Sequence, residues 1–395
     1  TMIGLAFSLM FGDGASAYLS LKLGEKKKEE AGKGVANGIA MSVIIALIMC
    51  VITLGFLPQL LNVFGCTDNL REYALKYGYI IAIGLPFMMI GTTLNSIIRA
   101  DGSPKYSMVS MVAGAVLNII LDPIFIFVFN MGVKGAAIAT ILSSICSAIV
   151  ILYWILVKKD TYVDVNLGEF KFDSSIAKDI LKVGIPASMD MLVMSIAMSL
   201  YMIFISSIAG EFGIASFTSG QRLYLFAIMP LTAIGTAVTA VVGSSFGAKN
   251  GEYISRAHKF GAKFGIIFGT CVTLILVVFA TQLSTIFAYT AETAHLVPEI
   301  TRYLQIACLC LPLTGAGMAS SFFYQGIGKG TISLSWTIIR EVIFTVGATF
   351  FFGIYLGWGL IGIWAGLAIG RAAASILNYL YARYTIKGIR ETLGN

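Results

Sequence analysis

The residues best suited to ion chemistry in this sequence are an asparagine and an aspartate inside an apolar stretch. Asn118 and Asp122 lie four residues apart in the segment 107–130, so a helix would place both side chains on one face, one turn apart. A carboxylate in the middle of a membrane costs about 2.5–3.5 kcal/mol or more and is rarely present without a role. Carboxylate and amide oxygens suit Na⁺, or a carboxylate that gains and loses H⁺. The pair therefore predicts a cation-coupling site, and the alternative is a structural hydrogen bond between helices.

Further oxygen ligands lie close to this pair in the sequence. Pro123 follows Asp122 and has no N–H, so the carbonyl of Ile119 loses its usual helical partner. Proline also tends to kink a helix, which makes Pro123 the predicted hinge. In the next apolar segment Thr140 offers a hydroxyl, and Ala136 lies one turn before it. These residues extend the predicted cation-coupling group.

Other charged residues inside apolar stretches are weaker candidates. Asp190 is a candidate second acid, although it lies early in its segment, where a helix N-terminus would favour its charge in any case. Asp13 ranks below it. Intramembrane cations need partners, and for Arg340 and Arg371 these could be Glu341, Asp190 or lipid headgroups. We expect a structural role for both arginines.

The composition is that of a membrane protein. Apolar residues make up 57% of the 395, charged residues only 12%, and the mean hydropathy is +0.87. Segments of about 20 apolar residues can each cross a bilayer, and their many Gly, Ala and Ser residues suit close helix packing. The sequence therefore predicts an all-α polytopic protein, with residues 2–21 as an additional span. The ten full segments are 34–58, 74–98, 107–130, 133–157, 184–209, 217–243, 260–283, 301–324, 332–356 and 359–382.

The chain contains an internal repeat. Tyr77 stands nine residues before Pro86, as Tyr303 stands nine residues before Pro312, and the two pairs are 226 positions apart. Two such halves can rock around a shared site, which favours a transporter over a duplication kept only for the fold. Further pairs with nearly the same spacing are Gly91 and Gly317, Gly102 and Gly328, Gly132 and Gly359, Gly12 and Gly235, and Gly24 and Gly247.

The repeat predicts two six-helix bundles. We expect an N-terminal lobe at 1–157 with helices 2–6, and a C-terminal lobe at 175–385 with helices 7–12. A cytoplasmic linker at 158–174 would join them, and 386–395 would form a cytoplasmic tail. Because the chain opens inside an apolar segment, we expect the first helix of a twelve-helix protein to be missing.

The net charge of +7 indicates topology and not nucleic-acid binding. Lys and Arg gather in alternate loops, as in 22–33, 158–182, 249–263 and 383–390, and short basic loops face the cytoplasm. The C-terminus is therefore predicted to be cytoplasmic. The six cysteines show no spacing of metal or disulfide type, and no catalytic constellation is present, so we expect no enzyme, no metal and no cofactor.

Several motifs resemble the multidrug and toxic compound extrusion (MATE) transporters, and most closely a bacterial multidrug-exporter branch. The resemblance covers essentially the whole chain in order. It implies a V-shaped pair of six-helix bundles in the inner (plasma) membrane that exports organic cations, including dyes and antibiotics, in exchange for H⁺ or Na⁺. The motifs are Leu94-Asn-Ser-Ile-Ile-Arg99-Ala-Asp-Gly102, Leu117-Asn-Ile-Ile-Leu-Asp-Pro123, Gly132-Val-Lys-Gly135, Gly184-Ile-Pro186, Met229-Pro230-Leu and Gly243-Ser-Ser-Phe-Gly247.

The resemblance also implies a cation site in the N-terminal lobe. Family members build it from an Asn and an Asp one turn apart on the fifth helix, with a Thr and an Ala carbonyl on the sixth. The spacing of these residues is matched here by those already singled out. Asp190 lies near an acid that other members place on the seventh helix. The tenth helix offers only Glu299, which gives little support to an ion site in the C-terminal lobe. The matching residues are Asn118, Asp122, Ala136 and Thr140.

Three other functions fit the sequence less well. A lipid-linked glycan flippase of the related superfamily would line its cavity with several basic residues, and only Arg340 and Arg371 qualify here. A membrane enzyme lacks a catalytic constellation. A non-transporting receptor or scaffold is the third alternative. We expect the protein to work in lipid as a monomer and to bind small organic cations and no nucleic acid.

Overall fold

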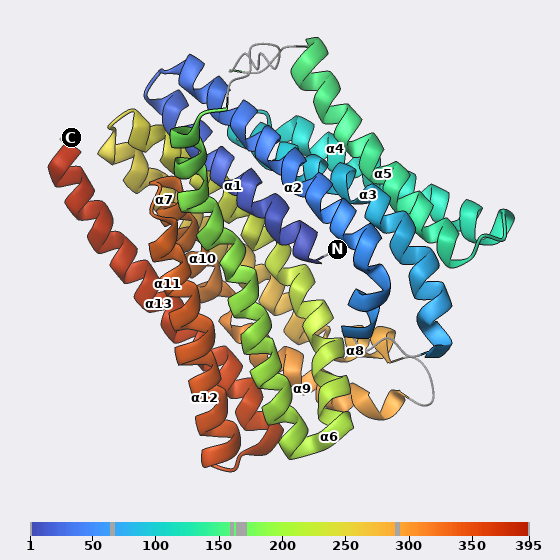
Figure 1. Cartoon of the computed structure of the whole chain (residues 1–395). Coiled ribbons are helices and arrows are strands. Elements are labelled where there is room, and N and C mark those ends of the chain that lie inside the picture. Colours follow the sequence, from blue (N-terminus) through green and yellow to red (C-terminus); the bar gives the residue numbers. More distant parts are fainter. Residues whose placement is uncertain (1, 64–67, 159–161, 163–171, 289–292, 394–395) are drawn as a thin grey trace. The chain divides into compact units, whose positions relative to one another are not determined.

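The computed structural model describes residues 2–63, 68–158, 162, 172–288 and 293–393. These residues are almost entirely helical and form no strand, which confirms the predicted all-α fold (Figure 1). The first helices are α1 (Met2–Gly24), α2 (Lys28–Val63), α3 (Asp68–Ala100), α4 (Pro104–Pro123) with the wider helical turn η1 (Ile124–Val128), and α5 (Val133–Tyr153) with η2 (Trp154–Lys158).

The remaining helices follow the central linker. The predicted linker 158–174 lies largely outside the described residues, and the predicted tail is helical as far as the structure describes it. The elements are α6 (Ser174–Gly247), α7 (Gly251–Val278), α8 (Ala280–Phe287), η4 (Ala294–Leu296), α9 (Val297–Ala307), η5 (Cys308–Cys310), α10 (Leu311–Gly326), α11 (Gly330–Ile338), η6 (Ile339–Val346), α12 (Gly347–Thr349), η7 (Phe350–Tyr355) and α13 (Gly359–Leu393).

The predicted membrane segments coincide with helix, within a few residues at their ends. Among the described residues, nine helical runs are long and apolar enough to cross a membrane. One of them is α6, whose 74 residues are interrupted at Gly210, where φ is 55° and ψ is −140°. This break separates the predicted segments 184–209 and 217–243. The chain is therefore a multi-pass membrane protein.

The internal repeat is visible in the turns between helices. Positive φ angles occur at Lys26 (60°) and at its counterpart in the second half, Lys249 (56°). Gly102 (89°) and Gly328 (74°) form a second such pair, and the sequence repeat had already matched these two glycines. Helices α2 and α7 begin at equivalent positions of the repeat, as do α3 and η4, α4 and α11, and α5 and α13. These helices of the two halves therefore begin at equivalent positions, which is consistent with the internal repeat.

The chain forms two compact units, Thr1–Ser188 and Met189–Asn395. The division falls within α6, because the first turns of that helix pack on α1. A Cβ at Gly184 would lie 1.9 Å from the Met10 carbonyl oxygen, and one at Gly14 would lie 2.4 Å from the Ile180 carbonyl oxygen. Glycine at both positions lets the two backbones touch. The predicted lobe boundaries at 157 and 175 stay a prediction.

The second unit has an aromatic core. The rings of Phe217, Tyr303 and Trp364 pack against one another, with centroid distances of 5.0–5.9 Å. The Tyr303 hydroxyl donates to Gln221 Oε1 at 2.6 Å, which satisfies the polar end of a fully buried side chain. Close approach of α7 and α10 at Gly265 and Gly315 completes the packing.

Candidate cation-coupling site

The predicted site lies where α4 and α5 pack together in the first unit (Figure 1). The Ser110 hydroxyl on α4 lies 2.7 Å from the Ser147 hydroxyl on α5. Toward the other end, a Cβ at Gly135 would lie 2.7 Å from the Phe125 carbonyl oxygen. An early residue of α4 thus meets a late residue of α5, and the reverse holds at the far end. The two helices are antiparallel and in contact over this length.

This register brings the four predicted ligand residues to the same part of the helix pair. Asn118 lies at the level of Thr140, and Asp122 lies at the level of Ala136. The Asn118 amide donates to Asp122 Oδ1 at 3.5 Å, and the Thr140 hydroxyl donates to the Ala136 carbonyl oxygen at 2.9 Å. Each bond stays within one helix and spans one turn. The oxygens gathered here are amide, carboxylate, hydroxyl and carbonyl, which are ligands that hard monovalent cations accept.

The backbone widens directly after the predicted hinge. Pro123 has helical angles (φ −61°, ψ −37°), and α4 continues into the π-type turn η1. The second unit has a π-type turn at the equivalent place, η7, although Thr349 stands there instead of a proline. The wide turn therefore does not depend on the proline ring. Such turns recur at functional sites in helices, and the role of Pro123 as a hinge stays a prediction.

A cavity of about 510 Å³ adjoins this group. Asn118 and Thr140 line it, whereas Asp122 and Ala136 do not belong to its wall. The sequence alone did not predict this cavity or the hydroxyl groups in its wall, although Ser143, Ser144 and Ser147 follow Thr140 at helical spacing. The other lining residues are Leu9, Phe87, Met88, Gly91, Thr92, Asn95, Ser96, Arg99, Met111, Gly114 and Ala115.

Asp13, the weakest of the predicted acids, lies next to this cavity. The Ser96 hydroxyl donates to Asp13 Oδ1 at 3.2 Å, and Arg99 Nη2 lies 3.1 Å from the same hydroxyl. Ser96 and Arg99 both belong to the cavity wall. A serine thus connects a carboxylate on α1 with a guanidinium on α3.

The other two predicted acids belong to the second unit. Asp190 is partly buried on α6, two residues beyond the division between the units. Glu299 is buried on α9, where its carboxylate accepts from Trp364 Nε1 at 2.7 Å and pairs with Arg302 at 3.3 Å. A carboxylate tied to an indole and a guanidinium has a structural explanation.

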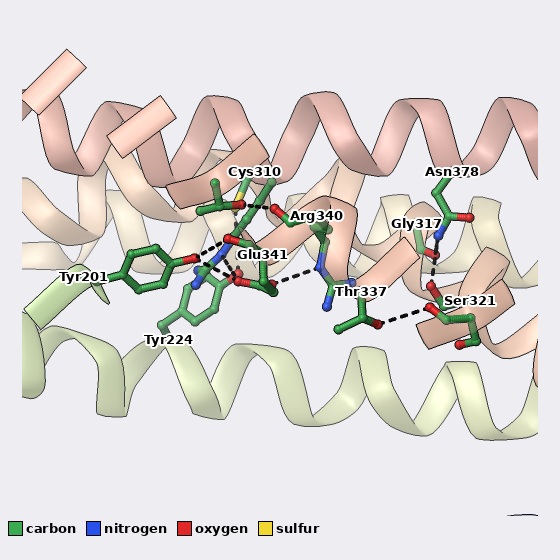
Figure 2. A network of polar contacts seen from close by, with 12 residues as sticks. Tyr201, Tyr224, Cys310, Gly317, Ser321, Thr337, Arg340, Glu341 and Asn378 are labelled. Carbon is green, nitrogen blue, oxygen red and sulfur yellow. Dashed lines mark hydrogen bonds and ion pairs between the residues drawn. The ribbon is translucent and has the colours of Figure 1, made fainter. Parts of the chain in front are cut away.

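The intramembrane arginines share one acidic partner, which Figure 2 shows between Tyr201 and Arg340. Glu341 Oε1 lies 2.9 Å from Arg340 Nε, and its Oε2 lies 3.8 Å from Arg371 Nε. The Tyr201 hydroxyl donates to Oε2 at 3.1 Å, and the Arg371 guanidinium lies 4.8 Å from the centre of the Tyr224 ring. Of the partners predicted for these arginines, the structure places Glu341 beside both.

The fold defines a polytopic helical membrane protein with an internal repeat, and its first unit contains the four predicted site residues on α4 and α5. The MatE family model matches residues 1–124 and 186–351, and the chain belongs to this family.

Named relatives and solved structures resemble the chain over nearly its whole length. The multidrug export protein MepA of Staphylococcus aureus (strain N315) is 29% identical over 384 residues, 94% of this chain and 81% of MepA. A crystal structure of MATE in complex with MaL6 is 34% identical with a TM-score of 0.95 and covers 99% of this chain and 87% of that one. A MOP superfamily transporter from Pyrococcus furiosus Vc1, whose binding pocket of reverse polarity suggests a different function, is 34% identical with a TM-score of 0.94, and the match covers 98% of this chain and 86% of that one.

Proposed function

We propose that this protein is a secondary active antiporter that exports organic cations and drugs in exchange for H⁺ or Na⁺. The observation that carries the proposal is the joint placement of Asn118, Asp122, Ala136 and Thr140 at one part of the α4–α5 pair, in a chain whose relatives are multidrug exporters. The protein would work in the inner (plasma) membrane with its C-terminus in the cytoplasm.

The mechanism follows from the charge of one carboxyl group. Ionised Asp122, bare or holding Na⁺, favours one conformation of the first unit, and the protonated or ion-exchanged form favours another. A cation can shift this equilibrium only if its affinity differs between the two states. We propose that the two conformations give the Asp122 carboxylate different surroundings, and this supplies the difference in affinity. Movement at the wide turn after Pro123 would then weaken the drug site, and the drug would leave outward.

The flippase alternative is not favoured. It would need unpaired basic residues that bind a pyrophosphate, and the two intramembrane arginines that could serve, Arg340 and Arg371, both lie beside Glu341. Their charge is therefore partly compensated within the protein.

The test is ethidium efflux from proteoliposomes under an imposed pH gradient or Na⁺ gradient. Asp122→Asn keeps the size of the side chain and removes its charge, so gradient-driven efflux should fall to background, because no ion exchange remains to drive it. The matched control is Glu72→Gln, which neutralises an exposed carboxylate that pairs with Lys76 on α3 and should leave efflux unchanged. Full efflux by Asp122→Asn would show that Asp122 does not couple ion movement to export.

A further inference from the structure

The cavity in the first unit is elongated along the helices. On α3 its wall runs from Phe87 to Arg99, which is 12 residues and therefore roughly 18 Å along a helix axis. One end lies at Asn118. The other lies near the turn between α3 and α4, because Asn95 bonds there to the first turns of α4 through the Ser107 carbonyl oxygen (3.1 Å) and hydroxyl (2.9 Å). The cavity thus reaches from the candidate coupling site toward one end of the bundle.

Most of the cavity wall is apolar, but six of its sixteen residues carry a hydroxyl group. Thr92 and Ser96 contribute from α3, and Thr140, Ser143, Ser144 and Ser147 contribute from α5. A water molecule in a protein interior needs two to four polar partners, and these hydroxyl groups, with the Asn95 and Asn118 amides, offer such partners on α3, α4 and α5. A small cation can therefore stay solvated by water and hydroxyl oxygens while it moves along the cavity.

Asp13 adds a negative charge beside the far part of this wall. Its carboxylate accepts from the Ser96 hydroxyl at 3.2 Å, and Arg99 donates to that hydroxyl at 3.1 Å. A hydrogen bond that only anchors α1 to α3 would not need a carboxylate, and an intramembrane carboxylate is costly. Close helix packing is already provided by Gly12, where a Cβ would lie 3.1 Å from Ser96 Cβ. The packing of α1 on α3 therefore does not require a carboxylate at Asp13, although the Arg99 guanidinium beyond Ser96 partly offsets its charge.

We propose that this cavity is the route by which the coupling cation passes between the Asn118–Asp122 pair and the aqueous phase near the α3–α4 turn, with Asp13 as a positioning residue that stabilises the cation on its way. This inference rests on the proposed function. Ion passage requires binding that is favourable enough for entry and weak enough for release. Asp13 supplies the attraction, and Arg99, joined to it through Ser96, limits it so that the cation is not trapped.

The test compares Asp13→Asn with wild type in the proteoliposome assay. Asn keeps the shape of the side chain and an acceptor oxygen for Ser96, and removes the charge. The maximal rate of gradient-driven ethidium efflux should fall at least about tenfold, which corresponds to ~1.4 kcal/mol, while the KM for ethidium stays unchanged. The pH-gradient and Na⁺-gradient arms show which cation uses the route.

A second variant blocks the route without touching a charge. Ser144→Leu replaces a hydroxyl in the wall by a larger apolar side chain, and it should slow efflux as strongly as Asp13→Asn with ethidium binding retained. Glu72→Gln is again the control and should match wild type.

Each outcome decides the inference. Wild-type efflux rates in both Asp13→Asn and Ser144→Leu would contradict the proposed route. If Asp122→Asn were inactive in the same assay, the proposed antiport would still stand. Loss of ethidium binding by Asp13→Asn would show a structural role and would also overturn the route. If wild-type protein shows no efflux under either gradient, the proposed function fails, and the route fails with it.

Discussion

At the residue scale, two intramembrane carboxylates have opposite surroundings. Glu341 is buried and lies within 4 Å of two guanidinium groups, with a tyrosine hydroxyl as a further donor. Asp122 is partly buried, and the donor on its own helix is the neutral amide of Asn118. A carboxylate held by two guanidinium groups suits a structural ion pair, whereas a carboxylate beside a neutral amide keeps its charge available for a bound cation. This contrast supports Asp122, and not Glu341, as the acid that couples cation movement to export.

The buried ion cluster leads to a prediction about stability. Glu341→Ala leaves Arg340 and Arg371 without their shared acid inside the unit, so the free energy of unfolding should fall by about 3–5 kcal/mol. The measurement is the thermal unfolding temperature of purified protein in detergent. The control is Glu252→Ala, which breaks an exposed pair with Arg256 on α7 and should leave that temperature nearly unchanged. Equal temperatures for the two variants would show that the cluster is not a structural support.

At the element scale, glycines decide how closely the helices approach. The sequence showed where glycines repeat, but it did not show that Gly14 and Gly184 bring α1 against the start of α6. That contact explains why the first turns of α6 belong to the first unit, although the sequence divided the halves in the linker before this helix. The wide turns η1 and η7 are a second element-scale feature, since they recur at equivalent places with and without a proline.

The contact between α1 and α6 predicts a strongly position-dependent effect of adding one methyl group. Gly184→Ala places a Cβ 1.9 Å from a backbone oxygen of Met10, so the two helices must separate, at a cost of about 1–3 kcal/mol in unfolding free energy. Gly388→Ala on α13 is the matched control, because nothing lies within 4 Å of the added atom. At Gly388, replacing a helical glycine by alanine should raise the free energy of unfolding by roughly 0.5–1 kcal/mol. Thermal unfolding in detergent distinguishes the two results, and a Gly184→Ala variant as stable as wild type would contradict the contact.

At the scale of the whole molecule, the distribution of charge predicts the orientation in the membrane. The alternation of basic and weakly charged loops predicts that the α1–α2 turn and the C-terminus face the cytoplasm, and that the start of α5 faces outward. The helix order is compatible with this alternation of loop charge. Each span crosses the membrane once, so every second loop lies on the same side.

Single cysteines test this orientation in a variant whose native cysteines are replaced by serine. Lys27→Cys and Lys387→Cys should react with an impermeant thiol reagent only when the cytoplasmic face is opened to it, because basic loops stay on that side. Lys134→Cys, exposed at the start of α5, should react in intact cells. Labelling of Lys27→Cys and Lys134→Cys from the same side would refute the predicted topology.

Features that are local or periodic could be predicted from the amino-acid sequence. Helix type follows from the length and composition of the apolar segments, and the repeat follows from glycine and proline spacing. The pairing of Asn118 with Asp122 follows from one turn of helix, as does that of Ala136 with Thr140.

Contacts between residues of different helices could be read only from the three-dimensional packing. The α4–α5 register placed the two predicted ligand pairs at one level, and the packing of α1 and α3 joined Asp13, Ser96 and Arg99 beside the cavity. The packing of α13 against η6 also places Glu341 beside both Arg340 and Arg371. These contacts depend on the rotation and register of separate helices, which local spacing does not fix, because each helix presents several faces of similar apolar character to its neighbours and to lipid.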